Sequence, residues 1–124
     1  MWRRALLAIT ITLIGYPALG KEPMDCSIGQ IEKTFGGTRW LVHGCSDGKS
    51  VVVVSAPGNP AMPFYFFVYP EGEGYRLYGE GNGDRAATKP AYDELSASLS
   101  EAFVTALHAE TVVSAKNSGA GDGT

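Results

Sequence analysis

Residues 51–69 read VVVVSAPGNPAMPFYFFVY, two apolar runs joined by a loop rich in proline and glycine. β-Branched and aromatic residues favour strands, which predicts strands over residues 49–55 and 64–69. In both runs the two alternating sets of side chains are apolar or aromatic, whereas a sheet with one solvated face alternates apolar with polar residues. We therefore expect that both faces of these two strands need cover.

Two further runs flank this pair of strands. Residues 39–45 precede it across Ser46-Asp47-Gly48, and an Asp-Gly turn between two such runs indicates a hairpin. Residues 75–79 follow it, across a turn at residues 71–74. Connections this short favour antiparallel pairing of sequence neighbours, so the sequence predicts a four-stranded antiparallel sheet.

A helix is expected on each side of the strand region. Ser27 and Gln30 have the spacing of a capping box, and apolar residues then recur at helical intervals, which predicts a short helix over residues 28–35. Towards the C-terminus a 3.6-residue apolar repeat predicts one long amphipathic helix, with His108 on its exposed side. The residues of this apolar stripe are Tyr92, Leu95, Leu99, Ala102, Phe103, Ala106 and Leu107.

The order of helix, four strands and helix predicts an α+β two-layer sandwich, in which the sheet carries the long C-terminal helix on one face. The short N-terminal helix and the proline-rich loop would cover part of the other face. Residues 21–115 then form a single small domain. Residues 116–124 are too polar and glycine-rich to pack and are expected to be a disordered tail.

The first 20 residues have the order of a cleavable signal peptide. Arg3 and Arg4 precede an apolar run over residues 5–14, and small residues at Ala18 and Gly20 suit a signal peptidase. The run is about half as long as the roughly 20 apolar residues that a membrane-spanning helix needs. We expect cleavage before Lys21, no stable membrane anchor afterwards, and a periplasmic or secreted protein.

The two cysteines, Cys26 and Cys45, bear on the redox compartment. In an exported protein an even cysteine count indicates a disulfide, which here closes a loop of about 20 residues and stabilises the fold by roughly 3 kcal/mol. The alternative is a pair of free buried thiols, which would suit a reducing compartment. The predicted signal peptide favours the disulfide.

The charge pattern excludes one class of partner. Without residues 1–20 the chain carries eight Lys and Arg against thirteen Asp and Glu, and the basic residues are scattered singly. Nucleic-acid binding requires a clustered basic stripe, so we expect no nucleic acid and no anionic membrane surface as a partner.

The sequence contains no clear catalytic site. His43, Cys45 and Asp47 resemble a nucleophile set in composition, but a reactive cysteine must be a thiolate and Cys45 is the partner expected for Cys26. The H-E-x-x-H, C-x-x-C and P-loop patterns are absent. We therefore predict no catalytic residue, no metal site and no cofactor, which favours a noncatalytic protein.

Two surfaces are candidate binding sites. The first is an aromatic patch on the uncovered sheet face, which would bind another protein or a second copy of the chain. Its residues are Tyr65, Phe67, Tyr69 and Tyr78. The second is the glycine-rich segment 79–85, interpreted as a turn, as a weak calcium loop or as a protruding recognition loop. Its polar residues are Glu80, Asn82, Asp84 and Arg85.

These observations favour an exported, noncatalytic, protein-binding or inhibitor-like module. One alternative is a small enzyme or ligand carrier, whose pocket between sheet and helix would use Arg76 and Tyr78. Another is a structural envelope component that binds only itself. The position of the largest concave site distinguishes the protein-binding module from the enzyme or ligand carrier, because a module needs a flat aromatic surface and a carrier needs a pocket.

Overall fold

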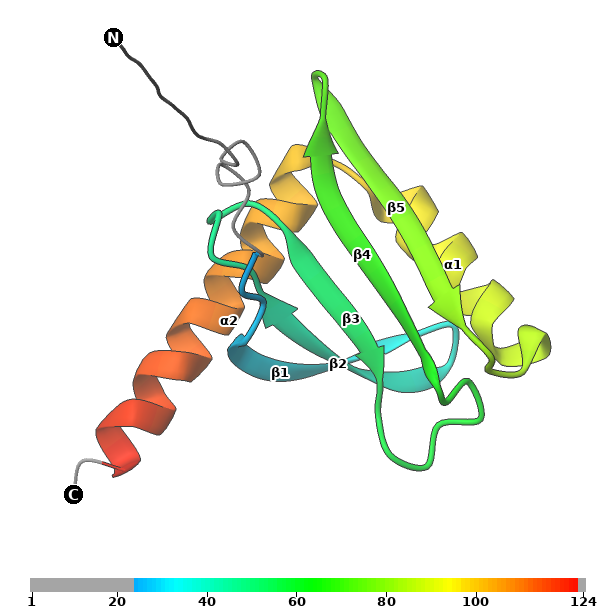
Figure 1. Ribbon diagram of the computed structural model, residues 1–124, viewed down its shortest axis with the longest axis horizontal. Helices are drawn as coiled ribbons and strands as arrows, with labels where there is room; N and C mark the ends of the chain where they lie inside the picture. Colours follow the sequence, from blue (N-terminus) through cyan, green and yellow to red (C-terminus); the bar gives the residue numbers. More distant parts are fainter. Residues whose placement is uncertain (1–23, 123–124) are drawn as a thin grey trace, which may run out of the picture.

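The computed structural model describes the backbone of residues 24–122 and the side chains of residues 24–118, so the predicted signal peptide lies outside the described residues. Five strands and then two helices follow one another in this part of the chain. They are β1 (Ile28–Phe35), β2 (Thr38–Gly44), β3 (Val51–Ser55), β4 (Phe64–Glu71), β5 (Gly74–Gly81), α1 (Arg85–Ser98) and α2 (Glu101–Asp122). The strands form one antiparallel sheet in chain order (Figure 1). The α+β class and the antiparallel sheet are confirmed.

The predicted helix over residues 28–35 is wrong, because this segment is β1 and adds a fifth strand to the sheet. Ile31 and Phe35 pack against the core, and the residues between them are alternately exposed and half-buried. This two-residue period is that of a strand. Gly36 and Gly37, with φ of 62° and 83°, form the two-residue turn to β2. Such a turn needs positive φ at both positions, so this glycine pair specifies a hairpin more strongly than the helical spacing specified a helix.

The predicted single C-terminal helix is divided into two. Leu99 has an extended ψ of 116° and ends α1, and the Ser100 hydroxyl accepts a hydrogen bond of 3.1 Å from the Phe103 N–H at the start of α2. The break lets α2 bury residues outside the predicted apolar stripe. Its buried residues are Val104, Leu107, His108 and Thr111, of which only Leu107 belongs to that stripe. Helix α2 also includes residues 116–122, so helical backbone runs through most of the predicted tail, whose mobility stays a prediction.

His108 was predicted to be exposed and is 8% exposed. Its Nε2 lies 2.9 Å from the Cys45 carbonyl oxygen, and the Thr111 hydroxyl donates to the His108 carbonyl at 2.6 Å. Helix α2 approaches the end of β2 so closely there that a Cβ at Gly44 would collide with Thr111 Oγ1. His108 and Thr111 can pack on the sheet because these two hydrogen bonds pair their buried polar groups.

Cys26 and Cys45 form the predicted disulfide, which joins the segment before β1 to the end of β2. The bond is compatible with an oxidising compartment. Cys45 is fully buried, and the hairpin that follows it is held by Asp47, whose carboxylate accepts hydrogen bonds from the Lys49 and Ser50 N–H groups at 2.9 and 2.8 Å.

Both helices lie on one face of the sheet, behind the strands in Figure 1. The core between them centres on Trp40, whose ring lies 5.2 Å from that of Phe66 and whose Nε1 donates to the Phe35 carbonyl at 3.1 Å. Ala61 brings the proline-rich loop to this same side. Residues 28–35 therefore extend the sheet instead of covering its second face, and Ala61 of the proline-rich loop packs in the core on the helix side. No helix of the described residues is long and apolar enough to cross a membrane.

Candidate functional site

The candidate site is the sheet face turned away from both helices. Its side chains alternate along β2 to β5 with the core residues Val42, Val53 and Phe66. We call this surface the open face, and its members are Leu41, His43, Val52, Val54, Tyr65, Phe67, Tyr69 and Tyr78. All eight are half-buried or exposed. They make a broad apolar and aromatic surface on a rigid sheet.

The strand register aligns these side chains into two rows across the sheet. The first row is Leu41, Val54, Tyr65 and Glu80, and the second is His43, Val52, Phe67 and Tyr78. Directly opposed side chains on one face lie about 4.5–5.5 Å apart at Cβ, so each row is a continuous line of contacts. Phe67 therefore has apolar or aromatic neighbours on both adjacent strands.

The aromatic rings of the open face are fixed in place. Phe67 and Tyr69 stack with their centroids 4.9 Å apart. The Tyr65 and Tyr78 hydroxyls donate hydrogen bonds of 3.2 and 2.9 Å to the same oxygen, Glu80 Oε1. A hydrogen bond to Glu80 raises the pKa of Tyr78, and desolvation together with Glu80 raises the pKa of Tyr65. Both hydroxyls stay protonated at neutral pH, and the side chains remain 37% and 48% exposed.

His43 lies among the apolar members of the open face, between Leu41 and the end of β2. Its Nδ1 is buried and has no hydrogen-bond partner among the described residues. Burial lowers the pKa of the imidazole, because the charged form loses hydration there. The ring is therefore neutral at pH 7 and extends the apolar surface.

Charged pairs surround this apolar centre. Arg39 Nε lies 3.1 Å from Glu32 Oε2, and Arg76 Nη1 lies 3.2 Å from Glu71 Oε1. All four side chains are more than half exposed, so each pair contributes little to folding stability. An apolar centre with a polar rim is the arrangement of protein–protein interfaces.

The four polar residues of segment 79–85 do not form one protruding loop. Glu80 lies in β5 and belongs to the edge of the open face, whereas the Asn82 N–H donates to the Pro63 carbonyl at 3.0 Å. Asp84 caps α1 by accepting a 3.0 Å hydrogen bond from the Ala86 N–H. Arg85 begins that helix. The segment is held at both ends by structural contacts.

No nucleophile site forms around Cys45, which is bonded to Cys26. Residues 44–48, GCSDG, have the G-x-S-x-G spacing of a nucleophile elbow, but such an elbow joins a strand to a helix and this segment joins β2 to β3. Ser46 Oγ accepts a hydrogen bond from the Asp25 N–H at 3.3 Å. Between residues 24 and 122 no cluster of His, Cys, Asp or Glu could hold a metal ion.

The sequence identified the four aromatic members of the open face but missed the four residues that β2 and β3 supply. The alternation of side chains along β3 could have assigned Val52 and Val54 to the open face, whereas assigning Leu41 and His43 to it required the register of β2 with β3. Arg76 and Tyr78, which the alternative of an enzyme or ligand carrier placed in a pocket, both lie on the open-face side of β5. Comparison with known proteins found no matching family model, no matching curated protein and no matching solved structure.

Proposed function

We propose that this protein is an exported, noncatalytic module that binds a partner protein through the open face. The observation that carries the proposal is the one-sided cover of the sheet, which leaves eight contiguous side chains without a lid among the described residues. Five of the eight are valine, tyrosine or phenylalanine side chains on β3 and β4. Large apolar patches on small proteins mark interaction sites. The disulfide supports a site of action outside the reducing cytoplasm.

The chemistry of the open face favours a protein partner. Tyrosines are preferred at interfaces because one ring buries a large apolar area and its hydroxyl still bonds. Tyr65 and Tyr78 present such rings with their hydroxyls already oriented by Glu80. A rim of both charge signs suits a mixed protein surface better than a phosphate backbone or an anionic membrane. The expected partner presents an apolar patch on an exported protein.

Phe67→Asp tests the proposal, because it places a charge at the centre of the open face. The tagged, oxidised protein is used for affinity capture from an extract of the exported fraction, with chemical crosslinks mapped by mass spectrometry. We expect crosslinks to β2–β5 and at least a tenfold loss of capture in Phe67→Asp, since buried aromatic anchors contribute upwards of about 2 kcal/mol. Val113→Asp is the matched control, because Val113 is apolar, 56% exposed and on α2.

Two readouts keep the result decisive. Thermal unfolding confirms that each variant is folded, and Tyr78→Glu replaces Phe67→Asp if the latter unfolds, because Tyr78 is the more exposed residue. Size-exclusion chromatography with light scattering identifies a second copy as the partner if a dimer forms and Phe67→Asp dissociates it. A monomer whose captured proteins are unchanged by both substitutions would refute the proposal.

A further inference from the structure

A cleft of about 320 Å³ lies on the helix side of the sheet, between α1 and strands β4 and β5. It is separate from the open face, because its strand residues belong to the opposite side of the sheet. The lining residues are Phe64, Phe66, Gly79, Arg85, Thr88, Lys89, Tyr92 and Asp93. This volume is at the lower end of the range for small-molecule sites, so it suits a ligand of one ring and a short side chain.

Aromatic rings form the apolar part of the cleft. Phe64 and Phe66 meet edge to face with centroids 5.0 Å apart, and Tyr92 of α1 lies 6.3 Å from Phe66. The arrangement requires a glycine in β5, because a Cβ at Gly79 would lie 2.9 Å from Phe64 Cε1 and 3.1 Å from Phe66 Cδ1. Gly79 therefore keeps the space above the two rings open.

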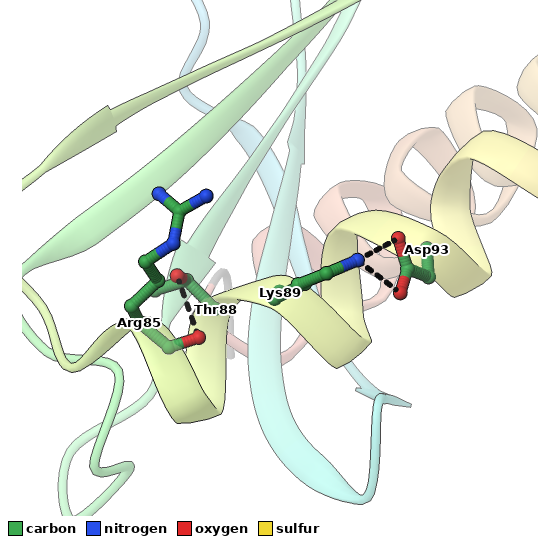
Figure 2. Close-up of polar contacts among 4 residues, drawn as sticks. All are labelled: Arg85, Thr88, Lys89 and Asp93. Atoms are coloured by element: carbon green, nitrogen blue, oxygen red, sulfur yellow. Dashed lines mark hydrogen bonds and ion pairs between the residues drawn. The ribbon is translucent and has the colours of Figure 1, made fainter.

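The polar side of the cleft carries one uncompensated positive charge. Lys89 Nζ binds both oxygens of Asp93 at 3.0 and 3.2 Å, so these two charges neutralise each other. Arg85 forms no ion pair with any residue of the described chain, and Figure 2 shows its guanidinium directed away from the Lys89–Asp93 pair. Thr88 supplies a hydroxyl that donates weakly, at 3.4 Å, to the Arg85 carbonyl. The fork of guanidinium donors is thus available to a ligand.

We propose that this cleft binds a small aromatic carboxylate, with its ring against Phe64 and Tyr92 and its carboxylate on Arg85. A guanidinium matches a carboxylate in a bidentate pair, which is among the strongest hydrogen-bonding arrangements in proteins. The single positive charge of Arg85 balances a monoanion, whereas it would neutralise only one of the two charges of a phosphate dianion. The apolar lining selects against small inorganic anions, because they would leave the rings hydrated.

An NMR titration with two matched probes tests this proposal on the oxidised protein. The probes are 3-phenylpropionate and its neutral amide, which share a ring and differ in charge. We expect the acid to shift the backbone amides of Gly79, Thr88 and Lys89 saturably, with a Kd on the order of millimolar, as befits a ligand of this size. The neutral amide should bind the same site more weakly.

Arg85→Gln should weaken the acid about 10- to 100-fold and leave the amide unchanged, since a charged hydrogen bond is lost from one probe only. Arg76→Gln is the control, because Arg76 is also exposed but lies on the other side of the sheet. Gly79→Ala should weaken both probes by filling the cleft. The proposal is overturned by unchanged acid binding in Arg85→Gln, by shifts confined to open-face amides, or by no saturable shift at about ten times the expected Kd.

Discussion

Reduction of the disulfide gives the sharpest test of what stabilises this fold. Cys26 and Cys45 are separated by 19 positions, and the chain-entropy model assigns about 3 kcal/mol to closing a loop of that length in the unfolded state. The native contacts around Cys45 do not depend on the S–S bond, because its carbonyl is held by His108 and its N–H by the Ser50 carbonyl. We therefore expect the reduced protein to fold and to be less stable by about that amount.

The measurement is urea unfolding, followed by Trp40 fluorescence, of the oxidised protein and of the same protein kept in phosphine reductant. The free energy of unfolding should fall by about 3 kcal/mol and the midpoint of thermal unfolding by roughly 10–25 °C for a domain of this size. Reduction is preferable to Cys45→Ser, because Cys45 is fully buried and a hydroxyl there adds its own desolvation penalty.

Two outcomes would refute this reasoning. A loss below about 1 kcal/mol would mean that the loop is already constrained in the unfolded state or that strain offsets the crosslink. Alkylation of both thiols in native protein, without prior reductant, would show that the bond does not form where the protein functions, and would remove the support for export.

Two further predictions concern single residues. Burial lowers the pKa of His43, so the stability that the neutral ring contributes is present above the unfolded pKa of about 6.5 and is lost as pH falls through the lower folded pKa. The thermal midpoint of His43→Val should therefore depend less on pH between pH 5 and 7 than that of the unsubstituted protein. The same pH dependence in both proteins would contradict this. Gly36→Ala should destabilise by more than about 1 kcal/mol in urea unfolding, because φ is 62° and a Cβ would collide with the Ala91 backbone, whereas Gly37→Asn, with φ of 83° and open space, should cost little.

The sequence predicted the strands that are rich in β-branched and aromatic residues and failed where short-range signals conflicted. In residues 28–35 the spacing of Ile28, Ile31 and Phe35 suggested a helix, while the glycine pair after Phe35 required a hairpin. The β1–β2 pairing aligns Ile28 and Ile31–Phe35 with β2, and this nonlocal pairing outweighs a marginal helix that contains Gly29.

The sequence did not predict the break in the C-terminal helix, for a different reason. Leu99 belongs to the predicted apolar stripe, and Ser100, which accepts a hydrogen bond at the start of α2, is equally compatible with the polar side of a continuous helix. The break depends on tertiary packing, because α1 contacts β1 and β5 whereas α2 contacts β1 to β3. One straight helix could not bury both Leu95 and Thr111 against a sheet that twists between those strands.

Folding alone does not account for the composition of the open face. The helix side already supplies a core with Trp40 and Phe66 fully buried, and the cross-strand pairs of the other side add only about 0.2–1 kcal/mol each. Polar β-branched residues would serve those pairs nearly as well and would not promote aggregation. The presence of Phe67 and Val52 where threonine would suffice is therefore better explained by a surface that is covered when the protein acts. This is the reason that Phe67→Asp should impair binding far more than it impairs folding.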